Sequence, residues 1–263
     1  MNKKQKIQTK ILSWYAKNKR DLPWRKTTDP YKILISEVML QQTQVDRVIP
    51  YYERWLKQFP DFKSLAKAEK AMLLQHWSGL GYNNRALRLQ QLAQIITERY
   101  HNKMPENEEA LLALPGIGPY TAHAILAFAF NKEVPVLDTN IRRVLIHELK
   151  LKENTEPERL RKIAKEIIPK NKSRIWHNAL MDYGALIVTA KKTGIASLSK
   201  QSKFEGSPRQ VRGAIIRLLL KEKKLSLKRI QKEFPHPQLK TIVEKMEKEG
   251  MVNFNKDRIQ LRN

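Results

Sequence analysis

Residues 114–121 have the sequence Leu-Pro-Gly-Ile-Gly-Pro-Tyr-Thr, and this stretch decides the fold. Gly116 and Gly118, two residues apart between apolar helices, let a backbone hairpin come close to another polymer. The N–H groups at the start of the next helix then face an anion. Asp138 follows one helix later, after the apolar residues 134–137. The pattern indicates a hairpin that binds a phosphate backbone, with a carboxylate beside it. For the Gly-x-Gly pair alone, an ordinary helix–helix turn is the alternative.

The charge of the chain indicates a polyanionic partner. Its 263 residues include 51 Lys and Arg against 26 Asp and Glu, a formal net charge of +25. Self-repulsion of this size favours a nucleic acid as partner over a merely solvated surface or a membrane surface. No apolar run approaches the ~18–20 residues of a membrane-spanning helix, and residues 1–6 lead into a helix pattern without a signal-peptide core. We expect a monomer without a membrane partner, either cytoplasmic and nucleoid-associated or nuclear.

The absence of cysteine limits the chemistry of the chain. It excludes disulfides, thiolate nucleophiles and cysteine-ligated zinc or iron–sulfur sites. Any catalysis must therefore come from other side chains.

Helical periodicity dominates the sequence before residue 200, so we predict an all-α fold. Apolar residues recur at helical spacing in five segments: 7–15, 33–39, 73–77, 89–96 and 122–129. Strand-like alternation is almost absent before residue 250. Prolines predict the helix ends, at Pro23, Pro30, Pro50, Pro60, Pro105, Pro115 and Pro135.

The composition changes near residue 200. Serine, glycine and proline between residues 197 and 208 predict a linker. Beyond it we predict helices at about 209–221, 226–234 and 237–250, then two short strands within 251–261 around an Asn-Lys-Asp turn. These are the elements of a small winged-helix-like domain, residues 208–263. From Lys200 onward there are 17 basic and 7 acidic residues, so we interpret this domain as a DNA-binding accessory, with a protein-docking module as the alternative.

Five ordered motifs carry a resemblance to a known family. They are Leu22-Pro23-Trp24-Arg25, residues 36–45, Gly79-Leu80-Gly81-Tyr82, residues 114–121 and Val136-Leu137-Asp138-Thr139-Asn140. Colinear from about residue 8 to 190, they closely resemble the adenine DNA glycosylases of the MutY type, within the helix-hairpin-helix superfamily. The resemblance implies a two-lobed helical fold, with double-stranded DNA that contains a mismatched or damaged base pair in the cleft. Residues 29–135 would form a six-helix lobe, and residues 1–28 with 136–200 a second lobe.

Two carboxylates suit the removal of a purine. Breaking the bond to deoxyribose develops positive charge on the sugar and negative charge on the leaving base, so an acid is needed at the base and a carboxylate at the sugar. Glu37 lies amid the apolar residues 33–40, where burial would raise its pKa and keep it protonated to donate to adenine N7; a surface glutamate is the alternative. Asp138 would stay ionised, with Asn140 and main-chain N–H groups as partners, and it is also a predicted helix N-cap.

Tyr120 decides the predicted reaction type. In relatives resembling endonuclease III, a lysine at this place attacks the sugar and goes on to cut the strand. Tyrosine has no amine, so we predict a monofunctional enzyme that leaves an abasic site. The Tyr120 hydroxyl is expected to hydrogen-bond Asp138, with a packing role as the alternative.

The resemblance also implies residues that contact DNA. Tyr82 resembles an aromatic wedge that helps to extrude the target base, a buried core tyrosine being the alternative. Gln41 and Gln42 resemble residues that insert into the duplex or line the adenine pocket. The hairpin residues Gly116, Gly118 and Thr121 would hold the DNA backbone.

Further residues are candidates for the adenine pocket and for an ion. Trp24 and Arg25 resemble the wall of the pocket and a polar contact to the base. Asp182 matches a pocket carboxylate, with a helix-surface charge as the alternative. No side chain is expected to bind a metal, but the carbonyls of the hairpin are a candidate site for K⁺ or Na⁺, at Leu112, Leu114 and Ile117.

The chain also departs from the family. Typical members carry four cysteines that hold a [4Fe–4S] cluster, whereas residues 188–201 have none, so we expect no cluster and no other cofactor. Typical members end in a MutT-like domain that recognises 8-oxoguanine; here the short basic domain stands in its place. Asn83 replaces the second of two tyrosines after Gly81. Recognition of the oxidised guanine therefore does not carry over from the family by resemblance.

Three functions follow from the sequence. The first is a base excision repair glycosylase that removes adenine opposite 8-oxoguanine or guanine. The second is a thymine or uracil mismatch glycosylase of the same fold, for which Tyr120 is also suitable, although residues 41–44 differ from what pyrimidine-specific relatives tend to have. The third is a non-catalytic DNA-binding regulatory protein, which would need neither Glu37 nor Asp138.

Overall fold

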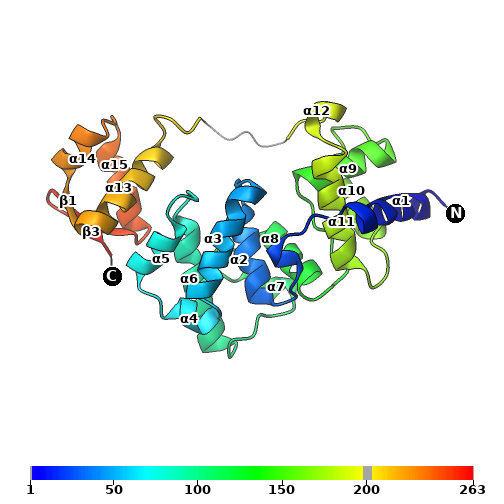
Figure 1. Cartoon of the computed structure of the whole chain (residues 1–263), viewed down its shortest axis with the longest axis horizontal. Coiled ribbons are helices and arrows are strands. Elements are labelled where there is room, and N and C mark those ends of the chain that lie inside the picture. The colour runs from blue at the N-terminus through cyan, green and yellow to red at the C-terminus, as the bar shows by residue number, and fades with distance from the viewer. Residues whose placement is uncertain (1, 198–202, 263) are drawn as a thin grey trace. The chain divides into compact units, whose positions relative to one another are not determined.

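The computed structural model of the chain describes residues 2–197 and 203–262 (Figure 1). Helices joined by short turns make up most of it, and a small sheet lies near the C-terminus. The chain divides into two compact units. Unit 1 comprises Met1–Glu37, Pro105–Ala113 and Ile117–Lys200, and unit 2 comprises Val38–Met104, Leu114–Gly116 and Gln201–Asn263. The lobe and domain boundaries expected from the sequence stay a prediction.

Unit 1 is built around a helix that is apolar on nearly all sides. Its elements are α1 (Lys3–Asn18), the 3-10 turn η1 (Pro23–Arg25), most of α2 (Pro30–Leu40), α7 (Glu108–Leu112), α8 (Pro119–Phe128), α9 (Thr139–Leu149), α10 (Pro157–Glu166), α11 (Ser173–Leu186) and α12 (Ala190–Thr193). Every residue of α8 from Thr121 to Phe128 is buried, as expected for a helix without a polar face. Helix α11 packs on α8, α9 and α1, and its Trp176 is fully buried.

Unit 2 combines four helices with the C-terminal segment. It contains the last turn of α2, then α3 (Val45–Gln58), α4 (Phe62–Ala66), α5 (Lys70–Trp77), α6 (Asn84–Arg99), α13 (Pro208–Glu222), β1 (Lys224–Ser226), α14 (Leu227–Glu233), α15 (Leu239–Lys248), β2 (Val252–Asn255) and β3 (Arg258–Leu261). The rings of Trp55 and Trp77 meet edge to face, 5.3 Å apart, in the core between α3 and α5. Helix α13 also packs on α5, so the C-terminal segment shares this unit with α5.

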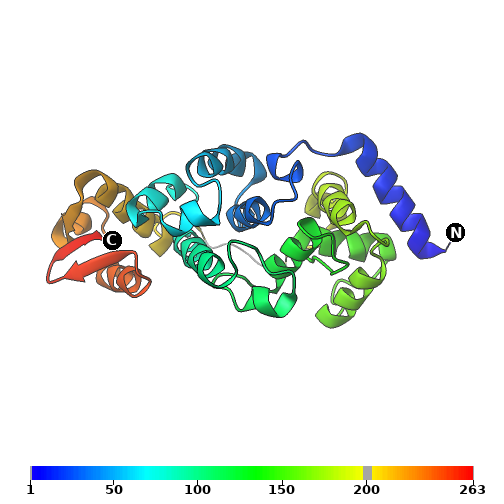
Figure 2. The same cartoon turned by 90° about the horizontal axis from the view of Figure 1, so that it is seen from below.

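The C-terminal elements agree with the sequence pattern except for one strand. Helices α13, α14 and α15 and strands β2 and β3 lie where they were predicted. Strand β1 was not predicted, because three residues are too short to show a period of two. The sheet is antiparallel in the order β1-β3-β2. The red strands near the C-terminus in Figure 2 belong to it. Its designation as a winged helix stays a prediction.

The helical segments predicted from apolar spacing are confirmed, but one helix end was wrong. Pro50 lies inside α3 rather than ending a helix. A proline inside a helix loses one backbone hydrogen bond and costs about 3 kcal/mol. Burial of Val48, Tyr52 and Trp55 along one face of α3 compensates for this loss.

The predicted linker includes residues 198–202, which lie outside the described residues. Among the helices that the structure describes, none is long and apolar enough to cross a membrane.

Candidate active site

The hairpin between α7 and α8 needs glycine at one of its two glycine positions. Gly116 has φ +83°, and a Cβ atom there would lie 3.1 Å from Cβ of Arg88. Gly118 has an ordinary extended conformation, caps α8 at φ −102°, and has no protein atom within 4 Å of the place of a Cβ. Pro119 then starts the helix, where its missing N–H has no intrahelical partner to lose. The hairpin is formed as predicted, with open space beside Gly118 and with Thr121 buried.

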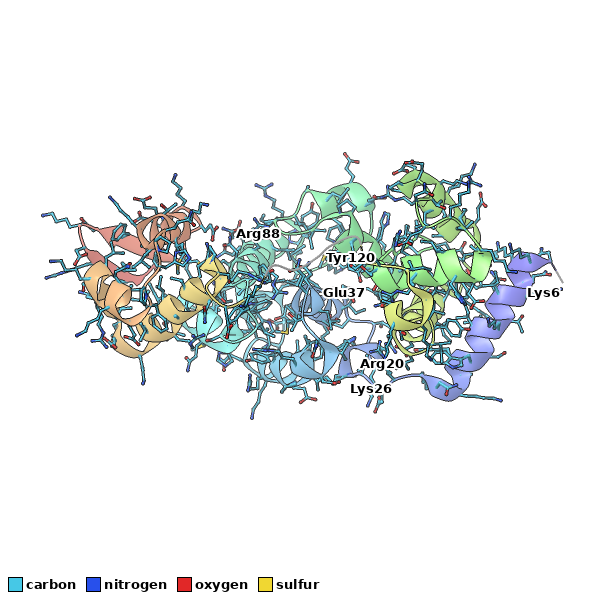
Figure 3. The ribbon with its side chains drawn as sticks, turned by 90° about the horizontal axis from the view of Figure 1, so that it is seen from above. Lys6, Arg20, Lys26, Glu37, Arg88 and Tyr120 are labelled. Atoms are coloured by element: carbon cyan, nitrogen blue, oxygen red, sulfur yellow. The ribbon has the colours of Figure 1, made fainter. Side chains whose placement is uncertain are left out.

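Glu37 is a buried acid on α2 (Figure 3). Only 6% of the residue is exposed, so the alternative of a surface glutamate was wrong. Burial raises the pKa of Glu37 to about 7, and the nearby negative charge of Asp138 adds to this effect. A hydrogen bond from Tyr120 and the positive charge of Arg25 act in the opposite direction. The carboxyl group is therefore poised to act as an acid near neutral pH.

Tyr120 bonds a different carboxylate from the one expected. Its hydroxyl donates to Oε2 of Glu37 at 3.0 Å, whereas the sequence led us to expect Asp138. The oxygens of Asp138 already accept from the Ile141 N–H at 2.7 Å and the Asn140 amide at 3.1 Å. Burial, followed by the charge of Glu37, raises the pKa of Tyr120 well above its usual value. The phenol therefore keeps its proton and acts as a donor.

Asp138 caps α9, as predicted. Its side chain accepts the N–H of Ile141 at the third position of the helix. Burial raises the pKa of Asp138, whereas the bonds from Ile141 and Asn140 and the charge of Arg143 oppose that rise. The capping hydrogen bonds thus favour the ionised form of Asp138, whereas burial favours its protonated form.

Arg143, which was not predicted from the sequence, supports Asp138 through Asn140. One of its nitrogens donates to Oδ1 of Asn140 at 3.2 Å, and the amide of Asn140 donates to Asp138. Arg143 is buried. A signal was present, because Asn140 and Arg143 are three residues apart and so share a helix face.

Two buried histidines hold the main chain just before Asp138, and these too were missed. One nitrogen of His123 lies 2.9 Å from the carbonyl oxygen of Pro135, and the other lies 2.9 Å from Glu108. The Val136 N–H donates to Nε2 of His177 at 3.2 Å. Burial lowers the pKa of His177 to about 4, so this ring is neutral and accepts. Nothing in the sequence links His177, on α11, to this segment.

Asp182 is the centre of a buried ion cluster. The residue is fully buried, so the alternative of a helix-surface charge was wrong. Arg25 donates two hydrogen bonds to its oxygens, at 2.5 and 2.7 Å, and Arg20 donates a third through its side chain at 2.6 Å. Burial raises the pKa of Asp182, but these bonds outweigh it and hold the pKa below its usual value. Trp24, next to Arg25, is buried.

The predicted wedge lies in unit 2. Tyr82 is 38% exposed, so the alternative of a core tyrosine was wrong. Both Tyr82 and Gln42 adopt left-handed backbone conformations, with φ +48° and φ +56°, and the Tyr82 hydroxyl donates to Oε1 of Gln42 at 2.6 Å. Non-glycine residues rarely adopt this conformation, and those that do cluster at functional sites.

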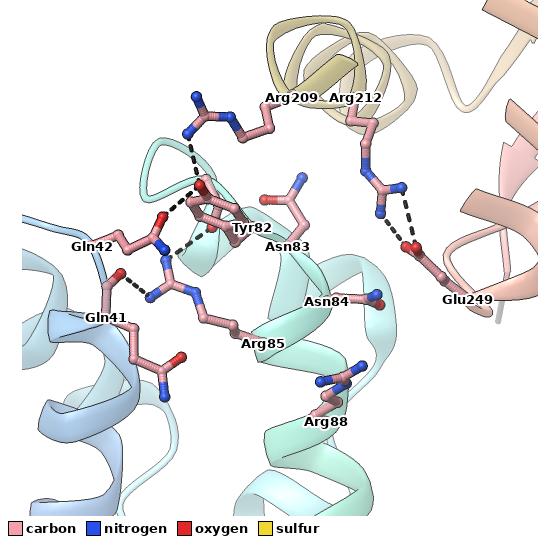
Figure 4. Close-up of a pocket in the computed structure, with 12 residues that line it drawn as sticks. Gln41, Gln42, Tyr82, Asn83, Asn84, Arg85, Arg88, Arg209, Arg212 and Glu249 are labelled. Atoms are coloured by element: carbon pink, nitrogen blue, oxygen red, sulfur yellow. Dashed lines mark hydrogen bonds and ion pairs between the residues drawn. The ribbon is translucent and has the colours of Figure 1, made fainter. Parts of the chain in front are cut away.

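Arg85 fixes the backbone of the turn that carries Tyr82 through hydrogen bonds (Figure 4). Its guanidinium donates to the carbonyls of Val38, Gln41 and Gly81, at 2.6, 2.9 and 3.1 Å. Burial lowers the pKa of Arg85 to about 10, which leaves it charged. The Arg85 side chain therefore links Gln41, the residue before Gln42, to the turn that carries Tyr82.

Metal ligation by side chains has no support in the described residues. There, no group of three or more His, Cys, Asp or Glu side chains is placed to hold a metal ion. The chain has no cysteine to ligate an iron–sulfur cluster. At the hairpin, Leu114 and Ile117 are buried, whereas Leu112 is exposed at the end of α7.

The sequence of this chain is similar to that of known proteins. Residues 35–170 match the family described as "HhH-GPD superfamily base excision DNA repair protein". The adenine DNA glycosylase of Mycolicibacterium smegmatis is 36% identical over 230 residues, which cover 80% of this chain and 78% of that protein. The adenine DNA glycosylase of Buchnera aphidicola subsp. Baizongia pistaciae is 41% identical over 180 residues, covering 67% and 51%.

A solved structure supports the same fold. A thermostable thymine-DNA glycosylase is 32% identical, with a TM-score of 0.66 over 72% of this chain and 89% of that chain. The chain therefore belongs to the HhH-GPD superfamily of base excision DNA repair proteins.

Proposed function

We propose that the chain is a monofunctional DNA glycosylase that removes adenine opposite 8-oxoguanine or guanine and leaves an abasic site. Membership of a base excision repair superfamily and relatives named adenine DNA glycosylase support the proposal. The observation that carries it is the buried Glu37, hydrogen-bonded by Tyr120 and with its pKa at about 7.

Glu37 is the proposed general acid. At a pKa of about 7, a large share of the molecules carry the proton at neutral pH. In our proposal the carboxyl donates this proton to adenine N7, so the base leaves as a neutral group rather than as an anion. The Tyr120 hydroxyl orients the carboxyl through its hydrogen bond.

Asp138 is the proposed stabiliser of the sugar. As the glycosidic bond breaks, positive charge develops on the deoxyribose, and a carboxylate beside it lowers the energy of that state. The Ile141 N–H, Asn140 and, through Asn140, Arg143 favour the ionised form of Asp138. Water then adds to the sugar carbon and gives up a proton to the Glu37 carboxylate, which completes the hydrolysis and restores the acid.

Tyr120 is the reason to propose a monofunctional enzyme. Strand cutting by this superfamily's chemistry needs an amine that attacks the sugar. The hairpin presents a phenol there, and its proton is firmly held. The product would therefore keep an intact backbone.

The remaining site residues have proposed roles on DNA. Trp24, Arg25, Gln42 and Asp182 would line or support the adenine pocket, and Gln41 and Tyr82 would enter the duplex. Gly116, Gly118 and Thr121 would hold the backbone at the hairpin, with a K⁺ or Na⁺ ion on the carbonyls of Leu112, Leu114 and Ile117. We propose that the chain acts as a monomer in the nucleoid or nucleus.

Thymine or uracil removal from a mismatch with guanine is the second candidate. The solved thymine-DNA glycosylase is 32% identical to this chain, and the match covers 89% of that protein. The match to the Mycolicibacterium smegmatis adenine DNA glycosylase covers 78% of that protein. A phenol at position 120 suits either base, so the pocket must decide between them.

One experiment separates these functions. Single-turnover reactions use duplexes with A:8-oxoguanine, A:G, T:G and U:G pairs, followed by alkali to reveal abasic sites. Cleavage of the adenine strand alone supports the proposal, and cleavage at T:G or U:G alone supports the second candidate. Absence of cleavage in every duplex, with duplex binding intact, would favour a non-catalytic DNA-binding protein.

A further inference from the structure

One peptide group of unit 1 has a histidine on each of its two polar atoms. This peptide joins Pro135 to Val136 in the irregular segment 131–138. Its carbonyl oxygen lies 2.9 Å from Nδ1 of His123 on α8, and its N–H donates to Nε2 of His177 on α11 at 3.2 Å. Buried backbone groups outside regular structure need partners of this kind. The two histidines therefore fix the plane of the peptide from opposite sides.

The segment that the histidines hold leads directly to Asp138. Val136 is fully buried, and Leu137 is the one residue between it and Asp138. The Asp138 side chain then accepts the N–H of Ile141 as the cap of α9. Fixing the peptide before Val136 therefore helps to fix where α9 begins and where the Asp138 carboxylate lies.

The hydrogen-bond partners of His123 determine which of its nitrogens carry protons. A main-chain carbonyl only accepts, so Nδ1 must carry a proton to bond Pro135. Nε2 lies 2.9 Å from Oε1 of Glu108 on α7, and an ionised carboxylate also only accepts. Both nitrogens are therefore donors, which makes the ring an imidazolium. Such charge-assisted hydrogen bonds are roughly twice as strong as neutral ones.

His177 has the complementary, neutral form. Its Nδ1 lies 2.8 Å from the carbonyl oxygen of Ser173 and so donates, which leaves Nε2 to accept from Val136. Burial lowers the pKa of His177 to about 4, and the charge of His123 acts in the same direction, whereas the bond to Ser173 opposes them. The titratable groups that face His123 are thus the Glu108 carboxylate on α7 and a neutral ring on α11.

We propose that His123, as an imidazolium, is a positioning residue for base excision. Its two protons join the Glu108 carboxylate to the Pro135 carbonyl and so hold the segment that carries Asp138. Because His123 is buried, it would act through Asp138 rather than on the DNA itself. Misplacing a catalytic group by about 1 Å can cost on the order of 100-fold in rate. The inference rests on the proposed function for the role of Asp138 beside the sugar.

Single-turnover excision at saturating enzyme measures the effect on the reaction. His123→Phe keeps a planar ring and loses both donors, so we expect its rate to fall roughly ten- to a hundredfold, with duplex affinity within a few-fold of the parent's. His123→Asn retains an amide donor near the place of Nδ1 and should recover most of the rate. His147→Phe, the same substitution at an exposed position on α9, is the control and should keep the parent rate. A parent-like rate in His123→Phe, or no recovery in His123→Asn, would overturn the inference.

Hydrogen exchange separates positioning from a general loss of stability. The amide of Ile141, which donates to Asp138, should exchange faster in His123→Phe than in the parent. The amide of Ile11, buried in α1 of the same unit, should exchange at the parent rate. Faster exchange at both amides would show that the whole unit is less stable rather than loosened at Asp138, and it would overturn the inference.

The protonation of His123 is checked without reference to activity. In long-range ¹H–¹⁵N spectra of the full chain near neutral pH, the His123 ring is identified by its absence from the spectrum of His123→Asn. We expect protons on both of its nitrogens and a proton on Nδ1 alone of His177. A His123 ring with a single proton would overturn the inference.

Failure of this inference and failure of the proposed function give different results. Adenine excision that His123→Phe leaves unchanged would overturn the inference and leave the function standing. In a protein that removes no base, a doubly protonated His123 and faster exchange at Ile141 alone in His123→Phe would overturn the function, while sustaining the hold of His123 on Asp138.

Discussion

The hydroxyl of Tyr120 lies 3.0 Å from Oε2 of Glu37 and donates a hydrogen bond to it. This bond favours the anion of Glu37, whereas burial favours the neutral acid and prevails, so the pKa stands at about 7. An acid is most useful when its pKa lies near the working pH, because it can then both give and regain a proton.

Tyr120→Phe should move the pH profile of excision to higher pH. The variant loses the hydrogen bond that favours the Glu37 anion, so the pKa of Glu37 should rise further. The alkaline limb of the single-turnover rate, which reports loss of the proton from the acid, should shift in the same direction. A limb that stays in place or moves to lower pH would show that Tyr120 does not set the protonation of Glu37.

Glu37→Gln should abolish excision and stabilise the fold above neutral pH. The pKa of Glu37 is about 7 in the folded chain against 4.5 for an unperturbed glutamate side chain. Between these values the folded protein binds the proton and the unfolded chain does not, so stability falls as pH rises. The variant lacks this penalty and should be more stable above pH 7, by on the order of 3 kcal/mol.

Urea denaturation across this pH window checks that prediction. Glu98→Gln, at an exposed position on α6, is the matched control and should change neither excision nor the pH dependence. Equal unfolding free energies for Glu37→Gln and the parent protein above pH 7 would contradict the assignment of a raised pKa.

His177→Gln should remove a loss of stability in acid. The pKa of His177 is about 4 in the folded chain against 6.5 ordinarily. As pH falls from 6.5 toward 4, the unfolded chain takes up a proton that the folded chain does not, so stability is lost. Glutamine accepts the Val136 N–H without titrating. The unfolding free energy of the variant should therefore decline less steeply across this window, which denaturation at stepped pH measures.

Asp138→Asn should stop excision while leaving the fold nearly intact. Asparagine caps a helix about as well as aspartate, so α9 should keep its first turn and the melting temperature should change little. The negative charge beside the sugar is lost, and that charge matters in the transition state rather than in binding. Duplex affinity within a few-fold of the parent, with the single-turnover rate lost, is the expected pair of results. A rate close to that of the parent would refute the role of Asp138.

Asp182→Asn should destabilise the protein strongly. The variant leaves Arg20 and Arg25 without the carboxylate that both bind inside unit 1. Removing one partner of a buried ion pair costs about 3–5 kcal/mol. Asp21→Asn removes the carboxylate of an exposed pair with Lys26 and should have little effect. Similar melting temperatures for the two variants would show that the cluster does not stabilise the fold.

The sequence predicted the helices and the two carboxylates because their signals are local. Apolar spacing marks α8, and the apolar neighbours of Glu37 on α2 imply its burial. The capping role of Asp138 also follows from its neighbours. The partner of Tyr120 did not follow, because Glu37 is 83 residues away.

Contacts between distant segments escaped the sequence for the same reason. The bond from Val136 to His177 joins residues 41 positions apart, and the contact of Arg209 with Tyr82 joins residues 127 positions apart. Pro50 shows a different limit, since burial along α3 overrides a local signal for a helix end. Tertiary packing decides such cases, and a single sequence carries little of that information.

Gly184 on α11 leaves no room for a side chain beside Asn140. A Cβ atom there would lie 2.8 Å from the carbonyl oxygen of Asn140 and 2.9 Å from its Cβ, closer than packed atoms tolerate. Even alanine would therefore displace the residue that donates to Asp138. The smallest possible enlargement, one methyl group, would misalign the Asp138 carboxylate without altering any charge, donor or acceptor. The absence of a side chain at Gly184 on α11 is thus as necessary to this site as the acid Glu37 on α2.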